Sequence, residues 1–445
     1  MTTTTILDRQ GGLSAAVLEQ IKATITRLSD ELHGIQQVLH NNPELAWEEK
    51  IAHDTATAYM ETKGFKVTRG AYGFPTAWKA VFDNGDGPTV GFNSEMDALR
   101  GIGHACGHNL ICIVGIGAAI GCAEFMKTHN VPGKIVLLGT PAEEAGGGKS
   151  FLVKEGAYDD MDICMMTHPM GQGKGAGIPF CSCAAGFSVK FKGASAHAAA
   201  HPDKGVNALD AAVSAYTNVA LLRQQIPDSH RIYLTVKGSE GWSANVIPAS
   251  SEIQIGIRAP TASEAITLIP RALNCVKAAA LATGCEVDIR REIMYLDTRH
   301  SDELCKYLGE ACAASWGPNE YTFEQEFRTP GSTDFGDVCY RVPAMHPFFR
   351  LPDMPKNETP HSDSYAKYSG TRSATDAAVQ SAAGIAFVGV RALVDAAWLK
   401  TVRQGWEKQM ADVGAPAMLE GLAALMQEFK PGTMAATAPC CQNGH

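Results

Sequence analysis

Short apolar runs alternate with longer apolar segments over the first third of this chain. The runs Thr89–Phe92, Lys134–Gly139 and Asp162–Thr167 have the length and composition of buried β-strands. The segments between them, Leu110–His129 and Lys149–Glu155, have the length of helices. Because strands that alternate with helices form βαβ units, this pattern predicts a parallel sheet.

Helical periodicity also marks the start and the end of the chain. Apolar residues recur at three- and four-residue spacing from Leu18 to Ile35, which predicts one amphipathic helix. Ser373–Trp398 predicts a long apolar helix that returns to the first domain.

The hydrophobic pattern changes near Gly186, where strands begin to alternate between apolar and polar residues. The predicted order is β-α-β-β-α-β, the order of a ferredoxin-like unit. Its elements are Phe187–Lys192, Val206–Gln224, Arg231–Lys237, Ser251–Arg258, Ala262–Leu281 and Glu286–Ile293. Helices and parallel strands like those of the first part of the chain are predicted again after this unit. We therefore expect the unit to be an inserted domain.

We therefore predict an α/β fold in which a mixed, mostly parallel sheet has helices on both faces and carries an inserted α+β domain. The expected parts are residues 1–185, the inserted domain 186–296, a return to the first domain at 297–430, and a disordered tail at 431–445. A length of 445 residues also favours two domains.

Composition narrows the class of protein. The chain is 45% hydrophobic and 19% charged, which is ordinary for a globular enzyme. Its net charge is −9 and it has no cluster of basic residues, so neither nucleic acid nor an anionic membrane is an expected partner. No uninterrupted run of about 20 apolar residues exists, so no membrane span is expected.

The cysteines indicate a reducing compartment. Thirteen cysteines, an odd number, are scattered through apolar segments. The start of the chain, MTTTTILDRQ, lacks the apolar core of a signal peptide. We therefore expect free thiols and a cytoplasmic location.

Potential metal ligands follow three of the predicted strands. Cys106 and His108 follow the first strand, Glu143 and Glu144 the second, and His168 the third. Parallel strands end at one edge of a sheet, which is where open α/β sheets bind ligands. A single buried histidine or cysteine is usually structural. Thiolate, imidazole and carboxylate together are the ligand set of zinc and related divalent ions, and a second glutamate could act as a general base.

Several motifs together resemble the M20 family of metallopeptidases over about residues 14–400. They are EMDAL and HACGHN (95–109), PAEE (141–144), THP (167–169), GASAHAAAHPDKGVNALDA (193–211), SANVIP (243–248), GSTDFGDV (331–338) and PHSDSY (360–365). The match is to subfamily D, the amidohydrolase branch, which includes aminobenzoyl-glutamate hydrolases and a type of dipeptidase. Glu95 and Asn109 stand where many members of the branch have aspartate.

The resemblance implies a site with two divalent ions. Its ligands would be Cys106, which bridges the ions, and His108, Glu144, His168 and His361. Glu143 would be the general base that takes a proton from the metal-activated bridging water. A thiolate ligand favours zinc, although imidazole and carboxylate also suit manganese or cobalt.

The inserted domain resembles the lid and dimerisation domain of the family. His197 matches a histidine that reaches the active site of the other copy in a dimer, so a homodimer is implied. Asn245 and Arg258 match positions that contact substrate, and Arg258 could hold a substrate carboxylate in a bidentate contact. Without the resemblance, each of these three would be an ordinary surface residue.

The predicted function is hydrolysis of an amide or peptide bond in a dipeptide or N-acyl amino acid with a free carboxylate. Three alternatives stay open. Cys106 and His108 could form the pair of a cysteine hydrolase. The chain could be a binding protein that kept the fold. The same metal site could also run amide formation or acyl transfer, because the chemistry is reversible.

Overall fold

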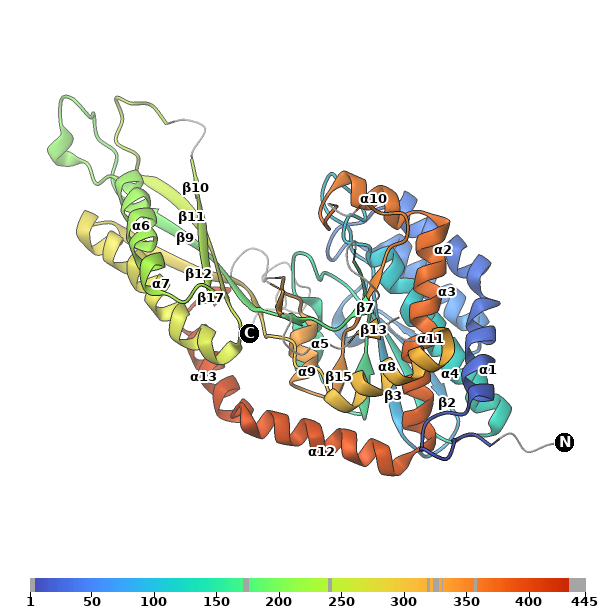
Figure 1. Cartoon of the computed structure of the whole chain (residues 1–445). Coiled ribbons are helices and arrows are strands. Elements are labelled where there is room, and N and C mark those ends of the chain that lie inside the picture. Colours follow the sequence, from blue (N-terminus) through green and yellow to red (C-terminus); the bar gives the residue numbers. More distant parts are fainter. Residues whose placement is uncertain are drawn as a thin grey trace.

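The computed structural model describes residues 5–170, 176–238, 242–317, 321–322, 328–329, 331–355 and 358–431. Figure 1 shows two units, each built on its own sheet, with a long helix, α12 (Ala396–Asp412), running between them. The first unit contains the six-stranded sheet and most of the helices, and the second contains a five-stranded sheet.

The first sheet is mixed and mostly parallel, as predicted. Its strand order is β1-β2-β4-β3-β5-β15, where β4, β3, β5 and β15 are parallel neighbours and β2 and β1 are antiparallel. The strands are β1 (Lys66–Arg69), β2 (Trp78–Asp83), β3 (Thr89–Glu95), β4 (Lys134–Thr140), β5 (Ile163–Met165) and β15 (Ala344–Met345). The central strand β3 is buried along its whole length, and its apolar start is followed by three buried polar residues, Asn93, Ser94 and Glu95.

Helices cover both faces of this sheet. On one face, Phe92 and Leu137 pack in a core with α1 (Ala15–Thr26), α2 (Ser29–Asn41), α3 (Lys50–Thr62), α4 (His108–His129), α8 (Asp302–Trp316) and α11 (Arg372–Val394). On the other face, Val136 and Leu138 pack with α5 (Gly148–Lys154) and α9 (Phe335–Cys339). The predicted two-sided arrangement is confirmed.

Two predicted helices are each divided in the structure. The expected helix from Leu18 to Ile35 is the pair α1 and α2, and Asp30 and Glu31 lie in the first turn of α2, where carboxylates favour a new helix start. The expected helix Ser373–Trp398 ends at Val394, because the Asp395 side chain accepts a hydrogen bond from Trp398 N and caps α12. Apolar spacing alone does not reveal such caps.

The second unit has the predicted β-α-β-β-α-β order. Its elements are β9 (Cys183–Lys192), α6 (Ala208–Leu222), β10 (Arg231–Lys237), β11 (Ser250–Ala259), α7 (Ala262–Thr283) and β12 (Glu286–Tyr295). The sheet order is β10-β11-β9-β12-β17, and α6 and α7 pack on one face in a separate core. The division of the chain at residues 186 and 296 stays a prediction.

The end of the chain packs on the second unit, which the sequence did not predict. After α12 (Ala396–Asp412), α13 (Ala415–Gln427) contributes Met418 and Leu422 to the core of the second unit. Then β17 (Lys430–Pro431) adds a short parallel strand beside β12. Apart from Pro431, the predicted disordered tail at 431–445 lies outside the described residues.

Shorter elements complete the described chain. Three pairs of short parallel strands are β6 (His168–Met170) with β16 (Phe348–Arg350), β7 (Ala176–Gly177) with β13 (Tyr321–Thr322), and β8 (Phe180–Cys181) with β14 (Arg328–Thr329). Helix α10 (Asp363–Ser369) follows the last loop before α11, and 3-10 turns occur at Ala71–Gly73, Pro202–Lys204 and Arg223–Gln225.

Three described helices, α4, α7 and α11, are long and apolar enough to span a membrane by length and composition alone. Each of them contains interspersed polar residues, so none is the uninterrupted apolar run on which the sequence-based expectation rested. In α4, 94% of the apolar window is buried inside the molecule, and in α11 78% is buried. Packing within the protein accounts for the composition of α4 and α11, whereas in α7 44% of the window is buried.

His300 lies between the two units in the sequence. Because its ring is buried and neutral, we predict that the protein loses stability in acid. Its Nε2 donates to Pro179 O and its Nδ1 accepts from His346 N, so the folded protein holds the neutral ring, and burial lowers its pKa to about 4. The unfolded chain, with a pKa near 6.5, therefore binds more protons as the pH falls. We expect the free energy of unfolding to drop by roughly 2.5 kcal/mol between pH 7 and 4.5 from this residue.

Urea unfolding at both pH values measures this effect. The variant His300→Gln, which has no titrating ring, should show a smaller drop than the unaltered protein. An equal drop in both proteins would contradict the assignment.

Candidate metal centre

The carboxyl edge of the first sheet collects the candidate residues. Strand β3 ends at Glu95, and the loop after it carries Asp97 and Cys106 before α4 begins at His108. Gly107 precedes α4 with φ 82°, and a Cβ added there would lie 2.5 Å from Pro169 Cγ. Only glycine fits this turn, and the turn places Cys106 and His108 next to the strand ends.

Cys106 lies against His168, the first residue of β6. Its Sγ is 3.3 Å from His168 Nε2, and His168 Nδ1 donates to Pro169 O at 2.7 Å. This hydrogen bond fixes the tautomer, so Nε2 presents a lone pair toward Cys106. Burial lowers the pKa of His168 to about 4, which keeps that ring neutral and able to act as a ligand.

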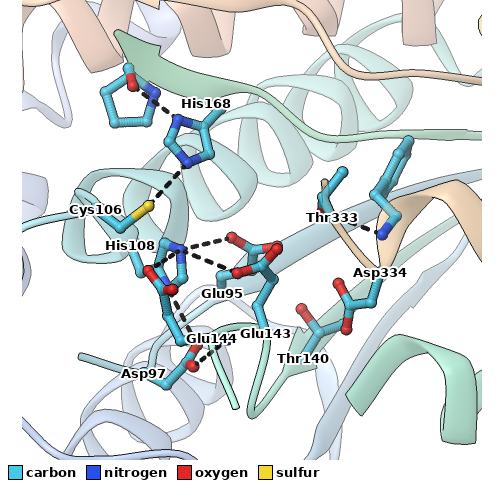
Figure 2. A network of polar contacts seen from close by, with 12 residues as sticks. Glu95, Asp97, Cys106, His108, Thr140, Glu143, Glu144, His168, Thr333 and Asp334 are labelled. Atoms are coloured by element: carbon cyan, nitrogen blue, oxygen red, sulfur yellow. Dashed lines mark hydrogen bonds and ion pairs between the residues drawn. The ribbon is translucent and has the colours of Figure 1, made fainter. Parts of the chain in front are cut away.

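His108 is enclosed by carboxylates (Figure 2). Its Nδ1 is 3.0 Å from Asp97 Oδ1, and its Nε2 is 3.3 Å from Glu95 Oε2. Burial alone would lower the pKa of His108, but the charges of Glu95 and Asp97 raise it well above its usual value. The carboxylates therefore favour a positive charge at His108 Nε2, which a proton or a metal ion would supply.

Glu143 and Glu144 lie in the loop that follows β4. Ala142 has φ 60°, and its N–H donates to Glu49 Oε1 at 2.8 Å, which turns the loop back toward the sheet edge. Tyr295 donates to Glu143 O and Glu144 N donates to Asp97 Oδ2, each at 2.9 Å. Burial, together with Glu95 and Glu144, raises the pKa of Glu143 well above its usual value.

His361 reaches the same place from a distant part of the chain. Its N–H donates to Ala105 O at 2.8 Å, and its Nε2 lies 3.3 Å from Glu144 Oε1. The contact with Glu144 raises the pKa of His361, although burial opposes the shift. The structure thus brings all five predicted ligands and Glu143 to one site.

These residues fit a pair of divalent cations. Two groups of donor atoms share the Cys106 sulfur, one with His108 and His168 and the other with Glu144 and His361, and within each group the atoms lie within 4.8 Å of one another. Two of the atoms, His108 Nε2 and Glu144 Oε1, are buried without a hydrogen-bond partner in the described structure. Buried polar atoms are normally satisfied, so a cation at their meeting point would remove this cost.

The charges at the site also favour cations. The side chains of Glu95, Asp97 and Asp334 are buried, and those of Glu143 and Glu144 are nearly so. A single buried lysine, Lys149, contacts two of these carboxylates. Burying more carboxylates than there are positively charged partners costs free energy, and bound divalent ions would offset this cost.

The structure argues against Cys106 as a nucleophile. Burial raises the pKa of its thiol well above the usual value, and the Glu144 carboxylate raises it further. A nucleophilic cysteine needs the opposite shift, toward the thiolate. A bound cation would supply that shift, which is what a ligand role requires.

Sequence reasoning missed Lys149, which lies beneath these ligands between two carboxylates. Lys149 Nζ lies 2.5 Å from Glu95 Oε1 and 2.8 Å from Asp334 Oδ1, and Lys149 is fully buried. His346 is also buried, with its ring centroid 5.9 Å from that of His168. The acidic turn after β3 was visible in the sequence, but nothing in the sequence linked it to Lys149.

The three predicted substrate contacts lie in the second unit. The loops that carry His197 and Asn245 project from the far end of that unit (Figure 1), and Ala198 N donates to Asn245 O at 2.9 Å. In the described part of the chain, neither side chain forms a hydrogen bond with the Cys106 group. Arg258 lies on β11 and bonds Tyr233, and its charge is among those that oppose the raised pKa of His361.

Asp97 orients two of the proposed ligands at once, which gives a prediction. Its two oxygens face His108 Nδ1 and Glu144 N, and asparagine has only one oxygen to serve both donors. We expect Asp97→Asn to weaken metal binding by about 10- to 100-fold, measured by titration calorimetry with zinc or cobalt. The control is Asp86→Asn in an exposed turn, and unchanged affinity in Asp97→Asn would contradict this role.

Comparison with known proteins places the chain among amide hydrolases. A model of the peptidase family M20/M25/M40 matches residues 84–383. The Xaa-Arg dipeptidase of Mus musculus is 36% identical over 419 residues, a match that covers 90% of this chain and 96% of the relative. A polypeptide of the p-aminobenzoyl-glutamate hydrolase of Escherichia coli (strain K12) is 30% identical over 333 residues, which covers 70% of this chain and 68% of the relative.

Solved structures share the fold. A dinuclear metal-binding peptidase of the M20 family from Bacillus subtilis superimposes with a TM-score of 0.61 at 18% identity, over 82% of this chain and 99% of that one. An aminobenzoyl-glutamate utilization protein from Klebsiella pneumoniae has a TM-score of 0.61 at 21% identity, over 81% and 98%.

Proposed function

The chain belongs to the peptidase family M20/M25/M40, and on this premise we propose that it hydrolyses the amide bond of a dipeptide or N-acyl amino acid with the help of two divalent metal ions. The observation that carries the proposal is the shared sulfur of Cys106, which belongs to both groups of donor atoms at the sheet edge. A single sulfur between two ligand groups is what a bridging ligand requires.

Cys106, His108, Glu144, His168 and His361 would hold the ions. When bound, two divalent ions would polarise the scissile carbonyl and lower the pKa of a water molecule. Zinc is our first choice because of the thiolate, with manganese or cobalt as substitutes. Asp97 would keep His108 and Glu144 in place through its two hydrogen bonds.

Glu143 would be the general base. It lies beside the donor atoms, with Oε2 3.9 Å from His108 Nε2, and its backbone carbonyl is held by Tyr295. Its carboxylate would accept a proton from the attacking water and then donate it to the nitrogen of the leaving amine. The neighbouring carboxylates and burial favour the protonated form of Glu143, which helps the second of these transfers.

The substrate would carry a free carboxylate, and Arg258 would bind it. Relatives named for Xaa-Arg dipeptides support a dipeptide with a C-terminal arginine as the first substrate to test. We propose that two copies associate through the second unit, so that His197 and Asn245 of one copy serve the site of the other. The relatives carry the names of hydrolases, so amide synthesis is not proposed.

We also propose a cytoplasmic location. Free thiols such as Cys112, Cys122 and Cys164 are buried in the core, which suits a reducing compartment.

Metal removal tests the proposed function. We expect dialysis against a chelator to abolish hydrolysis of an Xaa-Arg dipeptide, and zinc, manganese or cobalt to restore it. A panel that includes aminobenzoyl-glutamate and N-acetyl amino acids would define the substrate class. Undiminished hydrolysis after complete metal removal would overturn the proposal.

A further inference from the structure

Glu95, the last residue of β3, lies at the floor of the candidate metal centre and is 1% exposed. Its two carboxylate oxygens have different surroundings. Oε1 contacts Lys149 Nζ at 2.5 Å. Oε2 lies 3.3 Å from His108 Nε2, yet the contact lacks hydrogen-bond geometry, and among the described residues neither of these two buried atoms has a hydrogen-bond partner.

Two further residues hold Glu95 in this orientation. Lys149 Nζ contacts Asp334 Oδ1 at 2.8 Å, and Lys149 N donates to Asp334 Oδ2 at 2.8 Å. Lys149 and Asp334 are both 0% exposed. The ammonium group therefore cannot move into water, and the free oxygen of Glu95 stays directed at His108.

We propose that Glu95 is an additional ligand of the ion that His108 binds, and that Lys149 and Asp334 are its positioning residues. This inference rests on the proposed function, because it requires that His108 Nε2 binds a metal ion. The separation of the two atoms suits a shared ion: ligand atoms at about 2.1 Å from one ion lie roughly 3.0–3.4 Å apart at tetrahedral to octahedral angles.

The alternative is that Glu95 does not bind the ion and only accepts a hydrogen bond from His108. That role fails once His108 Nε2 coordinates an ion, because the nitrogen then has no proton to donate. Glu95 Oε2 would be a buried carboxylate oxygen beside a cation and without a donor. Coordination removes this cost without any movement of the backbone.

Cobalt substitution tests the proposal without relying on activity. The d–d bands of bound Co(II) report the coordination number, and the sulfur-to-cobalt charge-transfer band reports Cys106. We expect Glu95→Gln and Glu95→Asp to intensify the d–d bands, as a lower coordination number does, and to weaken the affinity for one ion by roughly tenfold or more. Glu95→Asp keeps the charge and only withdraws the oxygen, so it separates ligation from charge.

Glu155→Gln is the matched control, because it removes the charge of an exposed glutamate at the end of α5, outside the site. It should leave the d–d bands and the affinity for both ions close to those of the unaltered protein. If both Glu95 variants bind two ions with the d–d bands and the affinity of the unaltered protein, Glu95 is not a ligand. That result would leave the proposed function intact. Two other results would instead overturn the proposed function. One is that the unaltered protein does not bind Co(II), and the other is that the charge-transfer band persists in Cys106→Ala.

Discussion

Glu143→Gln is expected to lower kcat for dipeptide hydrolysis by about 10²- to 10⁴-fold while the protein still binds its metal ions. Glutamine keeps the size of the side chain but cannot accept a proton, so the attacking water loses its base and the leaving amine loses its acid. The contacts that position this loop use the backbone of Glu143 and Glu144, and they survive the substitution.

Steady-state kinetics and metal analysis of the same preparation check this prediction. The control is Glu155→Gln, which changes an exposed glutamate on the same stretch of chain and should leave kcat unchanged. Activity of Glu143→Gln within threefold of the unaltered protein, or loss of the metal ions in the variant, would show that Glu143 is not the base.

Lys149→Met is expected to lower the free energy of unfolding by about 3–5 kcal/mol. Lys149 is fully buried, and the carboxylates of Glu95 and Asp334 raise its pKa far above the usual value even though burial alone would lower it. Removing the ammonium group leaves two carboxylates buried without a counter-charge. Methionine matches the shape of lysine, so the cost comes from charge rather than from a cavity.

Urea denaturation followed by circular dichroism measures this loss. Lys154→Met, at an exposed lysine on the same helix, should change stability by less than about 1 kcal/mol. Adding Asp334→Asn to Lys149→Met should recover part of the loss, since it removes one of the two unpaired charges. A Lys149→Met protein as stable as the Lys154→Met control would contradict the account of this ion network.

The sequence was sufficient for the architecture because each unit follows its own hydrophobic period. The buried parallel strands β3 and β4 each contain an unbroken apolar stretch, whereas β10 and β11 alternate because one face of their sheet is more exposed. Helix boundaries were less predictable, since the start of α12 depends on the single side chain of Asp395 and α2 starts without a side-chain cap. The return of α13 to the second unit depends on long-range packing that no local pattern records.

The candidate site likewise has a part that could be predicted from the sequence and a part that could not. Its proposed ligands follow strand ends or belong to recognisable motifs, so they could be named from the sequence, although their roles stay predictions. Glu95 and Asp334 also belong to these motifs, but their shared contact with Lys149 could not be predicted, because it joins residues 54 and 185 positions apart. In the sequence, Lys149 is simply a polar residue in a predicted helix, and only the fold shows that it is buried.

Strand β17 limits how copies of this protein can assemble. Lys430 and Pro431 lie beside Arg290 and Arg291 of β12, and Pro431 has no N–H to offer a further strand. At the other edge of the sheet, β10 has β11 as its one described neighbour. Growth of a filament by strand pairing needs two complementary edges, and β17 with Pro431 interrupts the edge that β12 forms. Association through this sheet should therefore favour the β10 edge, where two copies can pair about a two-fold axis.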